Sequence, residues 1–181
     1  MKLWLVRHAQ PLIASGVCYG ATDVAADPQA TLQAAHELVR WLPQGQALVS
    51  SPLKRCAQLA QCLRMLRPDL SYKTDSRLAE MDFGCWEGQR WDAIPKADYD
   101  GWTADFADYR FGGHENVQAF MQRVASLWDE TQQAAEDAVW ITHAGVIRAA
   151  SLLALGVRQV NQAGQWPSAA PAFGRWCELA A

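Results

Sequence analysis

Several features that would assign this 181-residue chain to a particular class of protein are scarce or absent. Sixteen Lys and Arg against nineteen Asp and Glu give a formal net charge of −3. The chain thus lacks the basic surplus of nucleic-acid-binding proteins, and we expect no nucleic-acid partner. No apolar run approaches the roughly 20 residues of a membrane-spanning helix. The apolar start meets Arg7 before a signal-peptide core forms. We therefore expect a cytoplasmic protein without a membrane partner.

The cysteines also lack the pattern of a disulfide framework or a zinc ribbon. They are odd in number and scattered, without a Cys-x-x-Cys pair: Cys18, Cys56, Cys62, Cys85 and Cys177. Disulfide scaffolds and zinc ribbons show tighter, even-numbered spacing. The cysteines are therefore predicted to be reduced and to act mostly as small hydrophobic residues.

Half of the residues are hydrophobic, which excludes a disordered chain, and the length suits one domain over residues 1–181. Short apolar runs alternate with amphipathic segments. We expect strands at 2–6, 47–49, 70–74 and 138–142, helices at 32–42, 53–63, 117–131 and 146–155, and an edge strand near 173–179. This alternation predicts an α/β fold, a three-layer sandwich with a mainly parallel central sheet and helices on both faces.

Charged and polar residues follow the predicted strands where each strand ends. Arg7 and His8 end the first strand, and Arg55 lies in the first turn of the helix after the second. His143 follows a later strand and directly precedes a helix, whose first turn offers free N–H groups and the positive end of a dipole. Because ligands bind at the carboxyl ends of parallel strands, we expect these four side chains to converge into a pocket for a tetrahedral dianion.

A neutral imidazole is a usable nucleophile near pH 7, so a histidine in this pocket could attack phosphorus and hold a phosphohistidine. The departing alkoxide then needs an acid. Glu80 is our candidate, with Asp82 and Glu87 as competitors. A metal site is the other chemistry for two histidines and carboxylates, but no His-x-His or His-x-x-x-His spacing occurs and the arginines would repel a cation. We expect neither a metal nor a cofactor.

Four segments resemble, in order, the motifs of the histidine phosphatase superfamily, whose members have the phosphoglycerate-mutase-like fold. The segments are Leu5–Ala9, Ser51–Cys56, Leu78–Gly88 and Thr142–Arg148. The resemblance implies that His8 is the phosphorylated nucleophile and that Arg7, Arg55 and His143 hold the phosphoryl group. It also implies that Glu80 is the proton donor and later the base that activates water.

The chain is similar in length to the compact phosphatase branch of this superfamily, since the mutases are generally longer. Its segment Cys18–Val24 is similar to one in bacterial alpha-ribazole phosphatases, which act late in cobalamin biosynthesis. This similarity implies a small-molecule phosphomonoester substrate, with alpha-ribazole phosphate as a candidate. It also implies that Tyr19, Gly20 and Thr22 contact the substrate, and the motif Thr142–Arg148 implies the same for Ala144.

An irregular segment at about residues 81–113 holds eight of the eighteen aromatic residues. The default interpretation is a small satellite core beneath a loop. In the superfamily this region tends to overhang the active site, so the resemblance offers an alternative, a substrate-recognition cap for an aromatic or bulky apolar leaving group.

Some residues depart from the family pattern. Ala9 stands where glycine is usual, Pro11 where the family has Ser or Thr, and Ala14 where an Asn often binds phosphate. His114 intrudes before Glu115 in a segment that resembles another family motif, and both residues either contact substrate or make loop hydrogen bonds. These departures keep open the alternative of a non-catalytic protein that binds a phosphate ligand. A second alternative is a mutase-type phosphotransferase, which would require a covered site and a long-lived phosphoenzyme.

Overall fold

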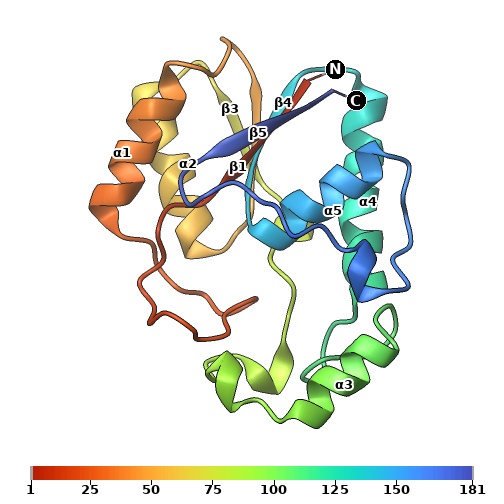
Figure 1. Cartoon of the computed structure of the whole chain (residues 1–181). Helices are drawn as coiled ribbons and strands as arrows, with labels where there is room; N and C mark the ends of the chain where they lie inside the picture. The colour runs from red at the N-terminus through yellow and green to blue at the C-terminus, as the bar shows by residue number, and fades with distance from the viewer. Residues whose placement is uncertain (1, 181) are drawn as a thin grey trace.

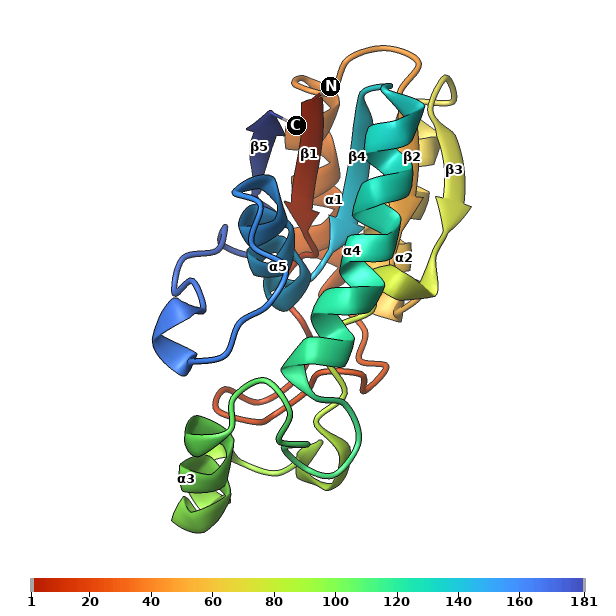
Figure 2. The same ribbon diagram turned by 90° about the vertical axis from the view of Figure 1, so that its right-hand side faces the viewer.

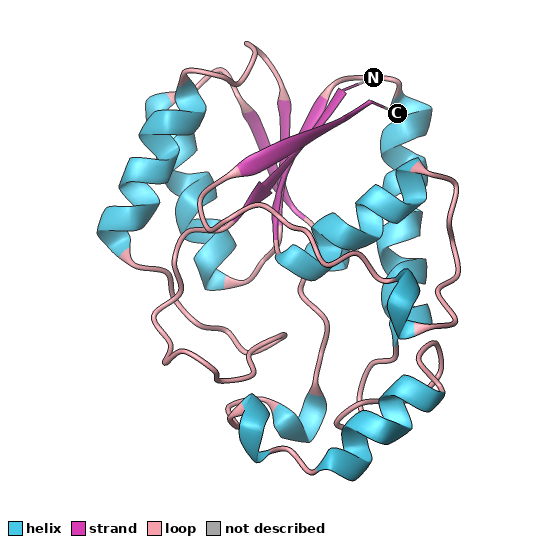
Figure 3. Cartoon of the chain, viewed as in Figure 1, coloured by secondary structure: helices cyan, strands magenta, loops and turns pink. Residues whose placement is uncertain are grey.

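The computed structural model describes residues 2–180, in which five strands form one sheet with helices on both faces (Figures 1 and 3). The strands are β1 (Lys2–Arg7), β2 (Ala47–Ser50), β3 (Ser71–Thr74), β4 (Ala138–Thr142) and β5 (Trp176–Ala180). The helices are α1 (Pro28–Val39), α2 (Lys54–Leu66), α3 (Lys96–Ala104), α4 (Val117–Ala134) and α5 (Ala144–Ala154). The predicted three-layer α/β fold is confirmed.

The strand order is β3-β2-β4-β1-β5, and only the edge strand β5 runs antiparallel to its neighbour. Along β1 the side chains alternate between faces. Leu3 and Leu5 belong to the core formed with α4 and α5, whereas Trp4 and Val6 belong to the core formed with α1 and α2. Burial on both faces explains why the inner strands are short, continuous apolar runs.

The segment from residue 81 to 113 lies beyond the carboxyl ends of the parallel strands (Figure 2). It contains short 3₁₀ turns and the helix α3, which the sequence did not predict. α3 has nine residues, a glycine near its middle (Gly101) and no buried residue, so it carries no apolar periodicity that could reveal it. No helix within residues 2–180 is long and apolar enough to cross a membrane.

Candidate active site

His8 and His143 lie together because β1 and β4 are parallel neighbours. Arg7 is paired with Thr142 in the register of these strands, so the residue after each is a histidine at the same edge of the sheet. The backbone N–H of His8 donates to the carbonyl of Thr142 at 3.1 Å. Both imidazole rings are buried, and their centroids are 5.2 Å apart.

The His8 ring is fixed in one tautomer. Its Nδ1 lies 2.7 Å from the carbonyl oxygen of Ala9, and since a carbonyl only accepts, Nδ1 carries the hydrogen. Nε2 therefore keeps its lone pair. Burial, together with the charges of Arg55 and Arg7, lowers the pKa of His8 to about 3. The ring is thus neutral at physiological pH, with its Nε2 lone pair free.

His143 has a protein partner on each ring nitrogen. Arg55 donates from Nε to its Nδ1 at 3.2 Å, so Nε2 carries the hydrogen and donates to the Ser51 hydroxyl at 2.8 Å. Burial and the nearby Arg55 hold the pKa of His143 well below its usual value. The Nε2–H group is therefore the polar hydrogen that a phosphoryl oxygen could share. Ala144, the first residue of α5, follows directly and is buried.

Arg55 is completely buried and is held by the loop that contains Tyr19. Its Nη1 donates to the carbonyl of Thr22 at 2.7 Å and its Nη2 to the carbonyl of Gly20 at 2.6 Å. The guanidinium carbon lies 5.4 Å from the centre of the Tyr19 ring. Three of the five guanidinium N–H groups are engaged, counting the bond to His143. The remaining two are available to a phosphoryl group.

The Glu87 carboxylate binds the N–H groups of the same loop, residues 20–22, whose carbonyls bind Arg55. It accepts backbone N–H groups from Gly20 at 2.9 Å, from Ala21 at 2.8 Å and from Thr22 at 2.9 Å. It also accepts the Thr22 hydroxyl, and the N–H of Phe83 at 3.1 Å. With so many donors on its two oxygens, Glu87 is a structural anion that links the loop to the third motif.

The Arg7 side chain is held in place by Pro171 and Phe173, but most of its N–H groups make no hydrogen bond to residues 2–180. Its Nη1 donates to the carbonyl of Pro171 at 2.9 Å, and its guanidinium stacks 4.0 Å from the centre of the Phe173 ring. Its Nε is buried without a hydrogen-bond partner among residues 2–180. A buried donor left unsatisfied costs about 1–3 kcal/mol. Although burial lowers the pKa of Arg7, arginine stays charged in proteins, so these donors suit a bound oxyanion.

Glu80 lies against the N-terminus of α5. Its Oε2 accepts the N–H of Gly145 at 3.0 Å, and its Oε1 accepts the N–H of Met81 at 3.1 Å. A Cβ atom on Gly145 would lie 2.2 Å from Oε1, so only glycine leaves room for the carboxylate. Asp82, by contrast, lies 3.0 Å from the exposed ring of His114. Of the three candidate acids, Glu80 is the one placed at the helix that follows His143.

Arg123 of α4 holds the segment that carries Glu80. Its guanidinium pairs with both carboxylate oxygens of Glu115, at 2.7 and 3.0 Å. It also donates to the carbonyls of Arg77 at 2.8 Å, Ala79 at 2.7 Å and Glu80 at 3.1 Å. Glu115 is thus engaged with Arg123, and this ion pair anchors the backbone on which the Glu80 carboxylate is mounted.

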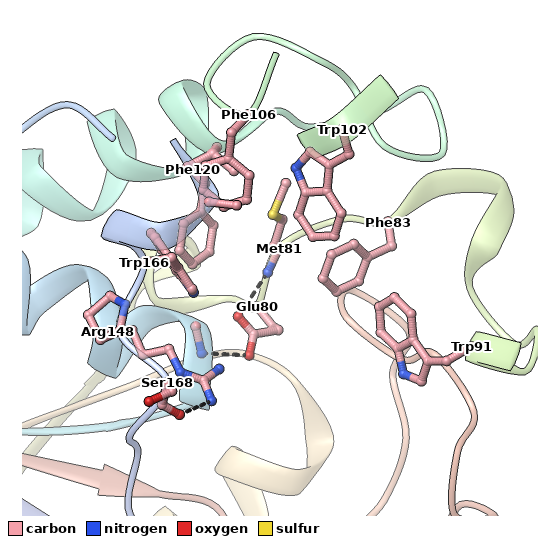
Figure 4. Close-up of a pocket in the computed structure, with 14 residues that line it drawn as sticks. Glu80, Met81, Phe83, Trp91, Trp102, Phe106, Phe120, Arg148, Trp166 and Ser168 are labelled. Atoms are coloured by element: carbon pink, nitrogen blue, oxygen red, sulfur yellow. Dashed lines mark hydrogen bonds between the residues drawn. The ribbon is translucent and has the colours of Figure 1, made fainter. Parts of the chain in front are cut away.

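A cavity of about 420 Å³ opens beside Glu80, and six of its fourteen lining residues are aromatic (Figure 4). Arg148 of α5 lies at its edge, donating from Nη2 to the carbonyl of Ser168 at 3.0 Å. The aromatic lining residues are Phe83, Trp91, Trp102, Phe106, Phe120 and Trp166. Four of these six come from the segment that the sequence predicted as a satellite core or cap.

Sequence reasoning assigned no role to Arg148, Trp166 or Arg123. Arg148 carries a usable signal, because it stands four residues after Ala144 and so shares its helix face. Trp166 and Arg123 carry no such signal in the sequence. Trp166 lies in the chain after α5 and Arg123 in α4, and only the packing of these segments brings them to the site.

Comparisons with known proteins agree with the geometry. The family described as Histidine phosphatase superfamily (branch 1) matches residues 3–168. The chain is 27% identical, over 88% of its length and 81% of the relative, to a protein of Hydrogenobacter thermophilus named "Putative phosphoserine phosphatase 2".

Solved structures share the fold. The protein TTHB049 from Thermus thermophilus is 32% identical, with a TM-score of 0.69 over 87% of this chain and 86% of that one. The alpha-ribazole phosphatase from Shigella flexneri is 22% identical, with a TM-score of 0.77 over 98% of this chain and 89% of that one. The relatives differ in the substrates that their names give.

Proposed function

Because the chain belongs to branch 1 of the histidine phosphatase superfamily, we propose that it hydrolyses a small-molecule phosphomonoester through a phosphohistidine at His8, without a metal ion. The observation that carries the proposal is the His8 ring itself. It is buried, neutral and fixed with Nδ1–H on the Ala9 carbonyl, so its Nε2 lone pair is free for attack on phosphorus. The superfamily relatives named as phosphatases support the reaction class.

Arg7 and Arg55 bind the phosphoryl oxygens in this account. Arg7 has a buried Nε without a partner in the described part of the chain, and Arg55 has two N–H groups left after its bonds to protein. The Nε2–H of His143 adds a further donor by exchanging Ser51 for a phosphoryl oxygen. Two fixed guanidinium groups neutralise the charge that spreads over the equatorial oxygens during transfer, and they disfavour a cation at the same place.

The reaction runs in two displacements. First, the lone pair of His8 Nε2 forms a bond to phosphorus while the ester P–O bond breaks, and the leaving oxygen takes a proton from Glu80. The alcohol departs. Second, water attacks phosphorus and gives a proton to the Glu80 carboxylate. The P–N bond breaks, its electron pair returns to Nε2, and inorganic phosphate leaves.

For the substrate, alpha-ribazole phosphate is our first candidate. The similarity of segment Cys18–Val24 to bacterial alpha-ribazole phosphatases supports it, as does the fold shared with the Shigella flexneri enzyme. In this proposal Tyr19, Gly20 and Thr22 act mainly by holding Arg55, since two of them contact it through backbone carbonyls. Phosphoserine, suggested by the name of the Hydrogenobacter relative, is the comparison substrate.

A non-catalytic role is less well supported. Among residues 2–180, Ala135 is the one non-glycine residue with positive φ, so the backbone at Ala9 does not require glycine. Pro11 pairs with Ala26 in an isolated bridge, and the loop around it is hydrogen-bonded. Ala9 and Pro11 are therefore accommodated in an unstrained, hydrogen-bonded backbone.

The test is steady-state hydrolysis of para-nitrophenyl phosphate in the presence of EDTA, by wild type and His8→Ala. We expect turnover by wild type that survives EDTA and falls by about 10³-fold or more in the variant. Full activity in His8→Ala, or complete loss on adding EDTA, would contradict the proposal.

A further inference from the structure

We propose that the cavity beside Glu80 binds the alcohol part of the substrate as a planar aromatic group. This inference rests on the proposed function, because it assigns the cavity to the leaving group of the phosphatase reaction. Glu80 and Gly145 line the cavity, and Glu80 is the residue that protonates the leaving oxygen. A leaving group that receives its proton from Glu80 therefore extends into this space.

The volume suits such a group. About 420 Å³ lies within the range of about 300–1,000 Å³ that is usual for small-molecule sites. It exceeds what a short alcohol would fill, so the cavity predicts a bulky leaving group.

The walls present aromatic rings at different angles. Phe83 and Trp91 meet edge to face, with centroids 5.4 Å apart, whereas Trp102 and Phe106 are stacked at 5.5 Å. Trp166, on the opposite side in Figure 4, meets Phe106 edge to face at 6.3 Å. A flat ring inserted among these can stack on one ring and meet another edge to face, whereas a puckered aliphatic ring can do neither.

Two residues that line the cavity each hold a buried donor without a partner. Nε of Arg148 and Nε1 of Trp102 are both buried without a hydrogen-bond partner among residues 2–180, and both residues line the cavity. An unsatisfied buried donor is costly. A small rotation of either side chain upon binding would bring its donor to an acceptor on the ligand, which would remove that cost.

The experiment compares benzyl phosphate with cyclohexylmethyl phosphate. Both are esters of primary alcohols of similar size and acidity, so the demand on Glu80 is nearly equal and only the flatness of the ring differs. We expect kcat/KM to favour benzyl phosphate by about three- to tenfold in wild type. The corresponding phosphonates, which cannot be hydrolysed, should show the same preference as competitive inhibitors.

Trp166→Leu tests the assignment to this cavity, since leucine keeps the wall apolar but removes the aromatic face. We expect the preference to fall below about twofold, with Trp41→Leu as the control because Trp41 is 68% exposed and absent from the cavity lining. Hydrolysis of both esters with equal kcat/KM in wild type would overturn this inference and leave the phosphatase proposal intact. If wild type hydrolysed none of the three compounds, benzyl phosphate, cyclohexylmethyl phosphate and para-nitrophenyl phosphate, the phosphatase proposal itself would be overturned.

Discussion

At His8, burial and the two guanidinium groups of Arg55 and Arg7 all lower the pKa of the imidazole. They lower its pKa from the ordinary 6.5 to about 3, so the free enzyme holds a neutral ring. In the unfolded chain the same ring takes up a proton below about pH 6.5. The unfolded state therefore binds more protons between about pH 6.5 and 3, and the contribution of His8 to stability is lost as the pH falls through that range.

We predict that the His8 ring, followed by NMR in phosphate-free buffer, does not titrate between pH 8 and 5. We also expect wild type to lose more unfolding free energy than His8→Asn between pH 6.5 and 4, as measured by urea denaturation. A titration of His8 with a midpoint near 6.5 would show that the ring is not desolvated as described.

Glu80 is a residue whose role depends on the leaving group. We predict that Glu80→Gln reduces kcat/KM for alkyl phosphates by about 10²–10⁴-fold, the usual contribution of a general acid. For para-nitrophenyl phosphate the rate of the first displacement should fall much less in this variant, because the leaving group departs without a proton. Pre-steady-state and steady-state assays on both substrates measure the difference.

Asp82→Asn is the matched control, because Asp82 pairs with the exposed His114. It should leave the ratio between the two substrate classes unchanged. If Asp82→Asn altered that ratio and Glu80→Gln did not, the acid would be Asp82.

At the scale of elements, the site depends on segments that meet only after folding. The loop at residues 20–22 binds Arg55 through two carbonyls and is itself held by Glu87 through its N–H groups. Glu87 thus positions Arg55 through the loop, and in the proposed function it does so without touching substrate. Hydrogen bonds to a charged group contribute roughly 1.5–3 kcal/mol each, so this loop is sensitive to the charge of one side chain.

We predict that Glu87→Gln weakens inorganic phosphate binding and lowers kcat/KM by about ten- to a hundredfold, since an amide accepts fewer of these hydrogen bonds. The ratio between alkyl and aryl phosphates should stay as in wild type, which separates a positioning role from that of the acid. Glu178→Gln, at an exposed position on β5, is the control. An unchanged phosphate affinity in Glu87→Gln would contradict the role assigned to Glu87.

The strands and most helices are predictable because each is a local pattern. The apolar run that ends at Arg7 and the one that ends at Thr142 are buried strands, and parallel-strand geometry alone predicts that His8 and His143 follow at one edge. The role of Glu87 is not predictable in this way, because its donors lie 65 to 67 residues away in the chain. The helix α3 is likewise hidden, since it buries no residue.

For the whole molecule, the fold places two different environments against each other. A polar, cationic site lies at the carboxyl ends of the strands, and an aromatic cavity lies between the irregular segment and α5 (Figure 4). Glu80 lines the cavity and belongs to the site. In the proposed function, the bond is cleaved beside Glu80, the sheet edge performs the chemistry, and the segment beyond it selects the substrate.

The most direct test of the account is to trap the phosphohistidine. In Glu80→Gln, para-nitrophenyl phosphate should still phosphorylate His8, while the missing base slows attack by water, so phosphoenzyme accumulates. Mass spectrometry after an alkaline quench should find one phosphoryl group, on His8, and none in the variant that also carries His8→Asn. Release of para-nitrophenolate with no phosphoryl group on His8, or with one on another residue, would contradict the central claim.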